Sequence, residues 1–168
     1  DVYESPRKDH NYLITVDVAR GLGNDYSAFI VFDITNFPYK AVAKYRNNEI
    51  KPMLFPSIIA DVGKSYNKAF ILCEVNDIGD QVASILNYDL EYDNLLMCSQ
   101  RGRAGQVVGA GFSGKRSQLG VRTTAAVKKL GCSNLKTLLE DDKILIIDYD
   151  IISELTTFSQ KHNSFEAE

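Results

Sequence analysis

The fold is decided by the stretch YLITVD at residues 12–17, an apolar run that ends in an acid. A second stretch, AFILCE at residues 69–74, has the same form. Both runs predict buried strands, so Asp17 and Glu74 are expected at strand ends. Ionised carboxylates are almost never fully buried unless they are paired or bind a metal. Two such acids at matching strand ends therefore predict a shared cation and a metal-dependent enzyme.

Length and composition favour a single domain, because 168 residues of which 45% are hydrophobic can build one core of ordinary size. The chain opens at Asp1 rather than at Met and stops at Glu168 without a closing element, so we expect a fragment of a longer polypeptide. The widely spaced Cys73, Cys98 and Cys132 predict reduced thiols. No apolar run approaches the ~18 residues of a membrane span. We expect a soluble, intracellular protein without a membrane partner.

The net charge of −3 conceals a strong asymmetry along the chain. The 46 residues between Asp93 and Glu140 contain no acid and eight basic side chains. These are Arg101, Arg103, Lys115, Arg116, Arg122, Lys128, Lys129 and Lys136. A basic block beside an acidic remainder is typical of phosphate binding, whereas the plainer alternative is a solvated helix face and a loop.

The pattern of apolar residues and turn signals predicts strands first and then alternating helices and strands. The expected strands are 12–18, 27–34, 39–46, 69–74, 95–98 and 144–147. The expected helices are 52–66, one capped by Asp77 or Asp80, 118–130, 134–141 capped by Ser133, and 151–160. The stretch 99–117 is too rich in glycine for a regular element.

This order of elements predicts an α/β fold, a mixed sheet with helices on both faces. The strands at 12–18 and 69–74 would lie side by side at its centre, so that Asp17 and Glu74 emerge at one edge. Three antiparallel strands followed by alternating helices and strands are the layout of ribonuclease H-like folds.

Other chemical signals in the chain are weak. The string GKS at residues 63–65 lies in a predicted helix and lacks the earlier glycine of a phosphate-binding loop. The glycines of residues 109–114 have dinucleotide-fingerprint spacing but lead into basic and polar residues instead of an apolar helix start. The two histidines, His10 and His162, lie near the chain ends and supply no obvious general base.

The two acids suit a hard cation such as Mg²⁺, which takes oxygen ligands and keeps several waters. In two-ion phosphodiester hydrolysis, ions about 3.5–4 Å apart activate a water and stabilise the leaving oxygen. Asp17 would bridge both ions and Glu74 would hold one. In the plainer alternative, Asp17 pairs with Arg20 and Glu74 caps the following helix.

Two segments of the chain resemble motifs of a known family. The segment ITVDVARG at residues 14–21, followed by GNDYSA at 23–28, resembles the first nuclease motif of large terminase subunits from T4-type tailed bacteriophages. The segment ILCEVN at residues 71–76 resembles the second motif. The resemblance spans essentially the whole chain and implies a nuclease domain with a ribonuclease H-like fold.

The resemblance also implies a function and a set of partners. The nuclease of such a terminase is a metal-dependent endonuclease that cuts double-stranded DNA concatemers during headful packaging, with Mg²⁺ or Mn²⁺ and two ions when substrate is bound. An ATPase domain of the same polypeptide drives DNA into the procapsid, and it is absent from this chain. The portal protein and the small terminase subunit are the other expected partners, in the cytoplasm of the bacterial host at the procapsid portal.

The family's metal site has a third acid, usually within an Asp pair that opens the final helix. The resemblance places this acid beyond Glu168, outside the chain. Asp148 and Asp150 follow a predicted strand and are expected to be peripheral.

DNA contacts are predicted from the placement of charge. Arg101, Arg103, Lys115 and Arg116 flank the glycine-rich loop that could clamp or gate the duplex. A nuclease that cuts DNA of any sequence should hold phosphates rather than read bases, so its binding should weaken steeply with salt.

Two other classes of function stay open at this stage. An actin-like ATP-handling domain on the same broad fold would need a glycine-rich phosphate turn between the first two strands, which GLGN at residues 21–24 only faintly offers. A noncatalytic docking or DNA-grip module would not depend on Asp17.

Overall fold

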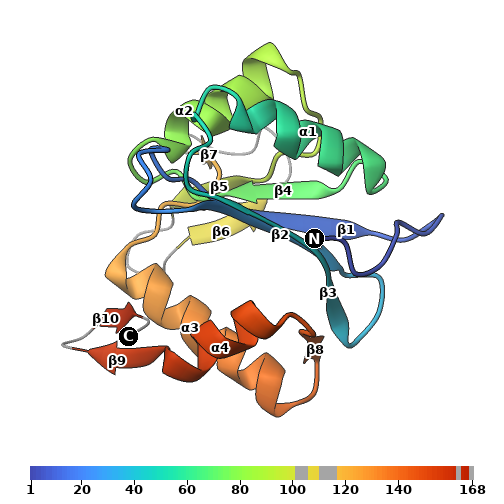
Figure 1. Ribbon diagram of the computed structural model, residues 1–168, viewed down its shortest axis with the longest axis vertical. Coiled ribbons are helices and arrows are strands. Elements are labelled where there is room, and N and C mark those ends of the chain that lie inside the picture. The colour runs from blue at the N-terminus through green and yellow to red at the C-terminus, as the bar shows by residue number, and fades with distance from the viewer. Residues whose placement is uncertain (101–105, 110–116, 162–163, 167–168) are drawn as a thin grey trace.

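The computed structural model describes residues 1–100, 106–109, 117–161 and 164–166, which are organised around a five-stranded sheet (Figure 1). Its strands are β1 (Tyr12–Asp17), β2 (Ser27–Asp33), β3 (Tyr39–Asn47), β4 (Phe70–Cys73) and β8 (Ile144–Leu145), in the order β4-β1-β2-β3-β8. The β1–β2 and β2–β3 pairs are antiparallel, while β4 runs parallel to β1 and β8 parallel to β3. The predicted mixed sheet is confirmed.

Alternating burial along β1 explains why this run forms a strand with two different faces. Tyr12, Ile14 and Val16 are buried on the face that carries the core, and Leu13 and Thr15 on the other face are only partly buried. This period of two is the pattern of a strand whose faces meet different environments.

The strands at 12–18 and 69–74 are neighbours, as predicted, but the prediction that both lie at the centre of the sheet is wrong. β4 is the end strand of the five-stranded order, and the chain continues the sheet past it through a parallel bridge between Ile71 and Leu95. The strand pair that carries Asp17 and Glu74 is thus bordered on both sides by other backbone.

The upper helical layer and the sheet enclose the core. This upper layer consists of α1 (Phe55–Ser65), α2 (Gly79–Ser84) and the π-helical turn η1 (Ile85–Asp89), which lie on one side of the sheet in Figure 1. The side chains of Phe55, Ile59 and Leu86 are fully buried there. Burial of large apolar side chains is the dominant favourable term in folding, so this layer anchors the sheet.

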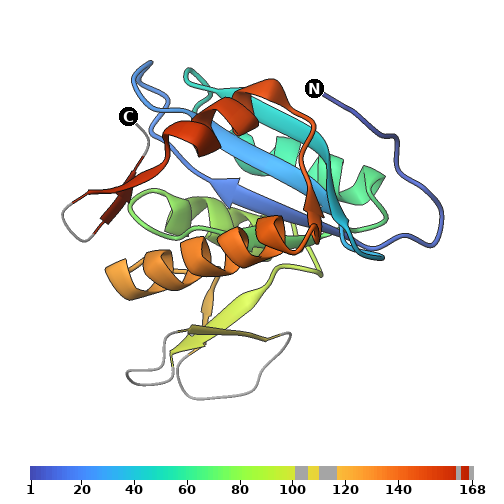
Figure 2. The ribbon, with the colours of Figure 1, turned by 90° about the horizontal axis from the view of Figure 1, so that it is seen from below.

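The lower helical layer packs much less tightly. It contains α3 (Ala125–Glu140) and α4 (Tyr149–Thr157), followed by the hairpin of β9 (Ser159–Lys161) and β10 (Ser164–Glu166), and it lies on the opposite side of the sheet (Figures 1 and 2). Neither helix contains a buried residue. Helices thus cover both faces, as predicted, but parts of the lower face stay open.

A small second sheet corrects the prediction that residues 99–117 hold no regular element. It is formed by β5 (Met97–Gln100), β6 (Gln106–Gly109) and β7 (Ser117–Leu119), with β5 in the middle. Both partners of β5 are antiparallel to it. Backbone pairing with β5 satisfies the hydrogen-bonding groups of these short segments despite their neighbouring glycines.

The boundaries of α3 and α4 also differ from the prediction. Instead of two helices, at 118–130 and 134–141, a single α3 runs through Gly131 and Ser133. Its N-cap is Thr124, whose hydroxyl accepts a hydrogen bond from the Val127 N–H at 3.2 Å. The Ser133 carbonyl accepts a hydrogen bond from the Thr137 hydroxyl within the helix, so Ser133 is no cap. Helix α4 begins two residues earlier than predicted, because the Asp148 side chain caps it.

All three cysteines are free thiols, Cys73 and Cys98 buried and Cys132 partly buried. In the described part of the chain, every helix is too short or too polar to cross a membrane.

Candidate active site

Strand register brings Asp17 and Glu74 together. Val16 is paired with Cys73, and the N–H of Glu74 donates to the Val16 carbonyl at 2.9 Å. Asp17 and Glu74 therefore follow neighbouring parallel strands at the same edge. Their carboxyl groups are close enough to share a hydrogen bond when one of them is protonated. The spatial convergence expected from the sequence is present in the structure.

The environment of Asp17 disfavours its negative charge. Asp17 keeps an exposed surface, but the surrounding protein removes part of the water from its carboxylate. This desolvation is the largest cause of the raised pKa of Asp17, and the negative charge of Glu74 is the next. The hydrogen bond from the Val18 backbone opposes this shift without cancelling it. The two carboxylates repel each other when both are ionised, and a bound divalent cation would relieve this repulsion.

Cys73 lies directly beside the acid pair, but its thiol is unreactive at neutral pH. Burial, together with the charges of Asp17 and Glu74, raises the pKa of this thiol to about 12. The thiolate is the nucleophilic form of cysteine, so Cys73 is excluded as a nucleophile at neutral pH.

Asn76 orients Glu74, a relation that the sequence did not reveal. Its side-chain amide donates to Glu74 Oε1 at 3.1 Å and to the Thr123 carbonyl at 3.0 Å. Its Oδ1 accepts from the Thr123 N–H at 3.1 Å. One side chain thus joins Glu74 to the segment that leads into α3. The only sequence signal was an amide two residues after a strand-end acid.

Two glycines allow the backbone to close around Glu74. A Cβ at Gly79 would lie 1.9 Å from the Glu74 carbonyl oxygen. A Cβ at Gly120, whose φ is +69°, would lie 2.1 Å from the Cys73 carbonyl oxygen. Both contacts are impossible for a residue with a side chain, so these glycines are required by close approach.

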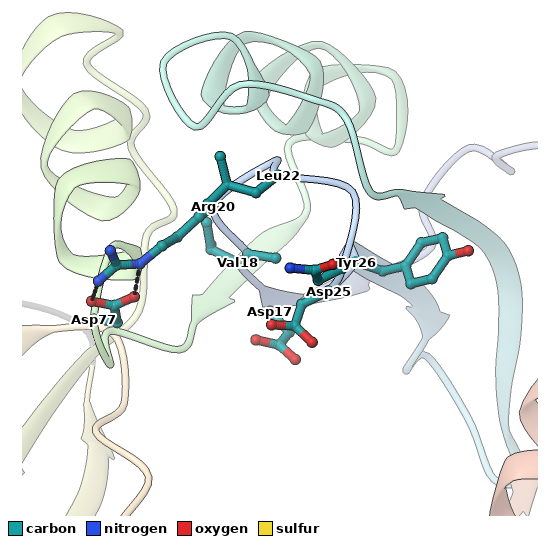
Figure 3. A pocket seen from close by; sticks show the side chains of 9 residues that line it. Asp17, Val18, Arg20, Leu22, Asp25, Tyr26 and Asp77 are labelled. Atoms are coloured by element: carbon teal, nitrogen blue, oxygen red, sulfur yellow. Dashed lines mark hydrogen bonds and ion pairs between the residues drawn. The ribbon is translucent and has the colours of Figure 1, made fainter.

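Asp25 is a further acid at the site that the sequence analysis did not single out. It lies in the β1–β2 loop and lines the same cavity of about 430 Å³ as Asp17. Figure 3 shows the two side chains on one side of this cavity, and the charge of Asp25 contributes to the raised pKa of Asp17.

The plainer roles considered for the two acids are wrong. Arg20 binds Asp77 rather than Asp17, through Nε at 2.8 Å and Nη2 at 2.6 Å from the two carboxylate oxygens (Figure 3). Glu74 does not cap α2, whose N-cap is Ile78 without a side-chain hydrogen bond.

The two acids also line a cavity on the lower face of the sheet. A second cavity of about 290 Å³ is lined by Asp17 and Glu74 together with the apolar surface of Ala28, Ile30 and Leu72. The acids thus stand between an upper, polar cavity and a lower, apolar one.

Asp148 and Asp150 form a separate cluster with Lys44. The Lys44 ammonium donates to Asp148 Oδ1 at 3.0 Å and to Asp150 Oδ2 at 2.9 Å, and the Tyr3 hydroxyl donates to Asp148. Asp148 is buried and caps α4, whereas Asp150 lines a third cavity that reaches Asp17.

The remaining predicted site residues are the four candidate DNA contacts. Arg101, Arg103, Lys115 and Arg116 fall outside the described residues. Within the described ranges, no group of three or more His, Cys, Asp or Glu side chains is placed to hold a metal ion. Among the described residues, Asp17 and Glu74 are the two acids that the register of β1 and β4 brings together.

Comparisons with known proteins agree with this architecture. A family model described as the terminase RNaseH-like domain matches residues 14–168. The large terminase nuclease of the thermophilic phage G20c, solved with bound magnesium, has a TM-score of 0.72 at 21% identity, over 99% of this chain and 77% of that chain. The same nuclease with bound cobalt has a TM-score of 0.69 at 23% identity, over 99% and 76%.

A third solved structure is the large terminase nuclease domain of Thermus phage P74-26. Its TM-score is 0.65 at 23% identity, over 97% of this chain and 71% of that chain. At these identities the structural similarity establishes the fold, which is ribonuclease H-like.

Proposed function

Since the chain belongs to the family of terminase RNase H-like domains, we propose that it is a metal-dependent endonuclease that cuts double-stranded DNA during packaging of a viral genome. The observation that carries this proposal is the meeting of the Asp17 and Glu74 carboxylates at the ends of β1 and β4. The finer assignment is cutting of concatemers in headful packaging by a T4-type phage, and it stays a prediction.

The donor set at this edge fits a hard divalent cation. Carboxylate oxygens are the ligands that Mg²⁺ and Mn²⁺ prefer, and one or two of them suffice when substrate phosphate completes the site. We propose that Asp17 and Glu74 hold the cation, that a third acid completes the site, and that two ions are present when DNA is bound. Bound ions would polarise the phosphate and lower the pKa of the attacking water. The G20c nuclease that shares this fold has been solved with magnesium and with cobalt.

The other residues of the site act by position. Asn76 holds Glu74 Oε1 and leaves its second oxygen to a ligand. The protonated thiol of Cys73 adds no competing nucleophile. The apolar surface of Ala28, Ile30 and Leu72 lines the lower cavity and lowers the dielectric around the reacting groups.

The proposed partners follow from the same family membership. Double-stranded DNA is the substrate, with Arg101, Arg103, Lys115 and Arg116 as candidate phosphate contacts. An ATPase domain of the same polypeptide, the portal protein and the small terminase subunit are further proposed partners, in the host cytoplasm at the procapsid portal.

Plasmid nicking tests this function directly. Supercoiled DNA is incubated with Mg²⁺ or Mn²⁺ and with the chain, a longer form that continues past Glu168, or variants of each. We expect cleavage, strongest in the longer form, and a loss of at least about a hundredfold in Asp17→Asn and Glu74→Gln, because each removes a charged ligand. Asp93→Asn, which changes an exposed acid of a distant ion pair, should cut as the parent does.

The competing functions predict different results. In the noncatalytic grip module, Asp17→Asn would leave every activity unchanged. An ATP-handling domain would bind nucleotide in calorimetry, but the structure offers little for it. The Gly23 N–H in the turn between β1 and β2 donates to the Asn48 carbonyl at 2.9 Å and is therefore engaged.

A further inference from the structure

A row of paired residues crosses the lower face of the sheet from the acid pair to an arginine. Asp17 is paired with Ala28 on β2, and Ala28 is paired with Arg46 on β3. Directly paired residues project from the same face of a sheet. Neighbouring strands are about 4.8 Å apart, so the Cα atoms of Asp17 and Arg46 are separated by roughly 10 Å. The small side chain of Ala28 leaves the space between them open.

A cavity joins the two ends of this row. Its volume is about 230 Å³, and its lining includes Asp17, Ala28 and Arg46. A DNA backbone that runs along this face and contacts the acid pair would therefore also pass close to Arg46.

The guanidinium of Arg46 is held in place but has donors to spare. Its central carbon lies 3.9 Å from the centre of the Tyr26 ring, which fixes the plane of the group by a cation–π contact. The charged partner Glu154 lies 3.6 Å away, which is too far for a hydrogen bond. Since Arg carries five N–H donors and its side chain is 40% exposed, Arg46 can still bind an anion.

Two other cations near the acid pair, Arg20 and Lys44, are already committed to acidic partners. Arg20 makes a bidentate contact with Asp77. Lys44 is 9% exposed and donates to Asp148 and Asp150. Of these three cations, Arg46 is the one that keeps exposed donors for a ligand.

A DNA strand that approaches Asp17, Asp25 and Glu74 meets a local excess of negative charge. A positive group on the same face reduces that repulsion, and phosphate binding by Arg also fixes the register of the strand. We propose that Arg46 binds a backbone phosphate of the DNA strand beside the one held at the acid pair. This inference rests on the proposed nuclease function and adds a positioning residue to it.

Salt-dependent binding gives a readout specific to a phosphate contact. Anisotropy of a labelled DNA duplex is measured in EDTA, so that no cleavage occurs, at several salt concentrations. The logarithm of the affinity falls as the logarithm of the salt concentration rises, and each lost phosphate contact should make this negative slope shallower by about 0.9, which corresponds to roughly tenfold weaker binding at 0.1 M salt. We expect this change for Arg46→Ala, whereas Arg46→Lys keeps the charge and should retain most of the slope.

The matched control is Lys68→Ala. Lys68 is an exposed cation with an acidic partner, Asp93, also at 3.6 Å, and it precedes β4 at the end away from Glu74. Its removal should leave the slope unchanged. An Arg46→Ala slope equal to that of the parent, or to that of Lys68→Ala, would overturn the inference.

Glu154→Gln separates DNA binding from a purely structural role of Arg46. If Arg46 binds phosphate, removing its acidic competitor should tighten DNA binding. If Arg46 only ties α4 to β3, Arg46→Ala and Glu154→Gln should lower the melting temperature alike and leave the salt slope unchanged, which would reject the proposal.

The nicking assay keeps the two proposals apart. Cleavage that depends on Asp17, together with an unaltered slope in Arg46→Ala, rejects the Arg46 contact alone. A parent chain that neither cuts nor binds DNA at low salt rejects both.

Discussion

At the scale of single residues, the neighbouring carboxylates of Asp17 and Glu74 cost stability in the metal-free protein. Two carboxylates within hydrogen-bonding reach repel each other when both are ionised, and burial adds to the cost for Asp17. Asn76 holds Glu74 in this unfavourable arrangement instead of letting it turn away. Strain of this kind is typical of sites that are completed by a ligand.

Asp17→Asn should therefore stabilise the metal-free protein while it abolishes cleavage. The pKa of Asp17 is raised, so its ionised form destabilises the fold above that pKa, and the gain from Asn should vanish as the pH falls and Asp17 becomes protonated. Because solvent screens this exposed group, we expect a gain of less than about 1 kcal/mol at pH 7. Thermal unfolding in EDTA measures it.

Asp93→Asn is the control for this measurement, because its exposed carboxylate has a cationic partner in Lys68. It should change the melting temperature little. A clear loss of stability in Asp17→Asn at pH 7 would show that the two acids do not repel each other in the folded protein.

At the scale of elements, α3 is a helix with little tertiary support. It has no buried residue, and its start depends on the Thr124 cap. Gly131 lies in its interior, where glycine weakens a helix because it loses more conformational freedom on folding than other residues. The helix continues through Gly131 because no neighbouring part of the protein packs against this exposed position and interrupts the helix.

Gly131→Ala should stabilise the protein by about 0.5–1 kcal/mol. The added Cβ would have no atom within 4 Å, so the change acts on the unfolded chain without steric cost. Urea unfolding followed by circular dichroism measures the free energy of unfolding.

Gly120→Ala is the matched contrast, with a Cβ 2.1 Å from the Cys73 carbonyl oxygen and a φ of +69°. It should destabilise strongly, because backbone must shift beside Glu74. A loss of stability in Gly131→Ala would mean that the chain is not helical at that residue.

At the scale of the whole molecule, the two helical layers are held by different forces. The upper layer is held by buried apolar side chains such as Phe55 and Ile59. The lower layer is held at the start of α4 by Lys44 and Tyr3, which bond to Asp148. Stability that depends on charge varies with pH, whereas apolar burial does not.

Asp148→Asn should therefore lower stability in a pH-dependent manner. Burial alone would raise the pKa of Asp148, but the hydrogen bonds from Lys44, Tyr3 and the Ile151 N–H outweigh it and lower the pKa to about 2. A lowered pKa contributes stability that is present above about pH 4 and is lost as the pH falls towards 2. We expect a deficit of at most about 2 kcal/mol at pH 7 that disappears near pH 2.

Urea unfolding at pH 7, 4 and 2.5 tests this dependence. Asp141→Asn, at an exposed carboxylate that pairs with Lys143, should show a much smaller deficit. A deficit of Asp148→Asn that is equal at all three pH values would show that the loss comes from packing rather than from charge.

The sequence by itself determined the strands of the five-stranded sheet and where the two acids stand. Alternating and continuous apolar runs are local signals, so the strands at Tyr12–Asp17 and Phe70–Cys73 could be recognised without any tertiary contact. The predicted alternation of strands and helices followed from the same signals. The single α3 was missed because glycine and serine in sequence suggest a break that an exposed helix does not need.

Only the tertiary structure decided which side chains join Asp17 and Glu74. Loop placement puts Asp25, and strand register puts Arg46, in cavities that Asp17 also lines, and Asn76 binds Glu74 while it also binds Thr123. Register depends on contacts between residues far apart in the chain, which no local pattern records. The strand ends could therefore be inferred from the residues, but the surroundings of the site emerge only when the sheet is assembled.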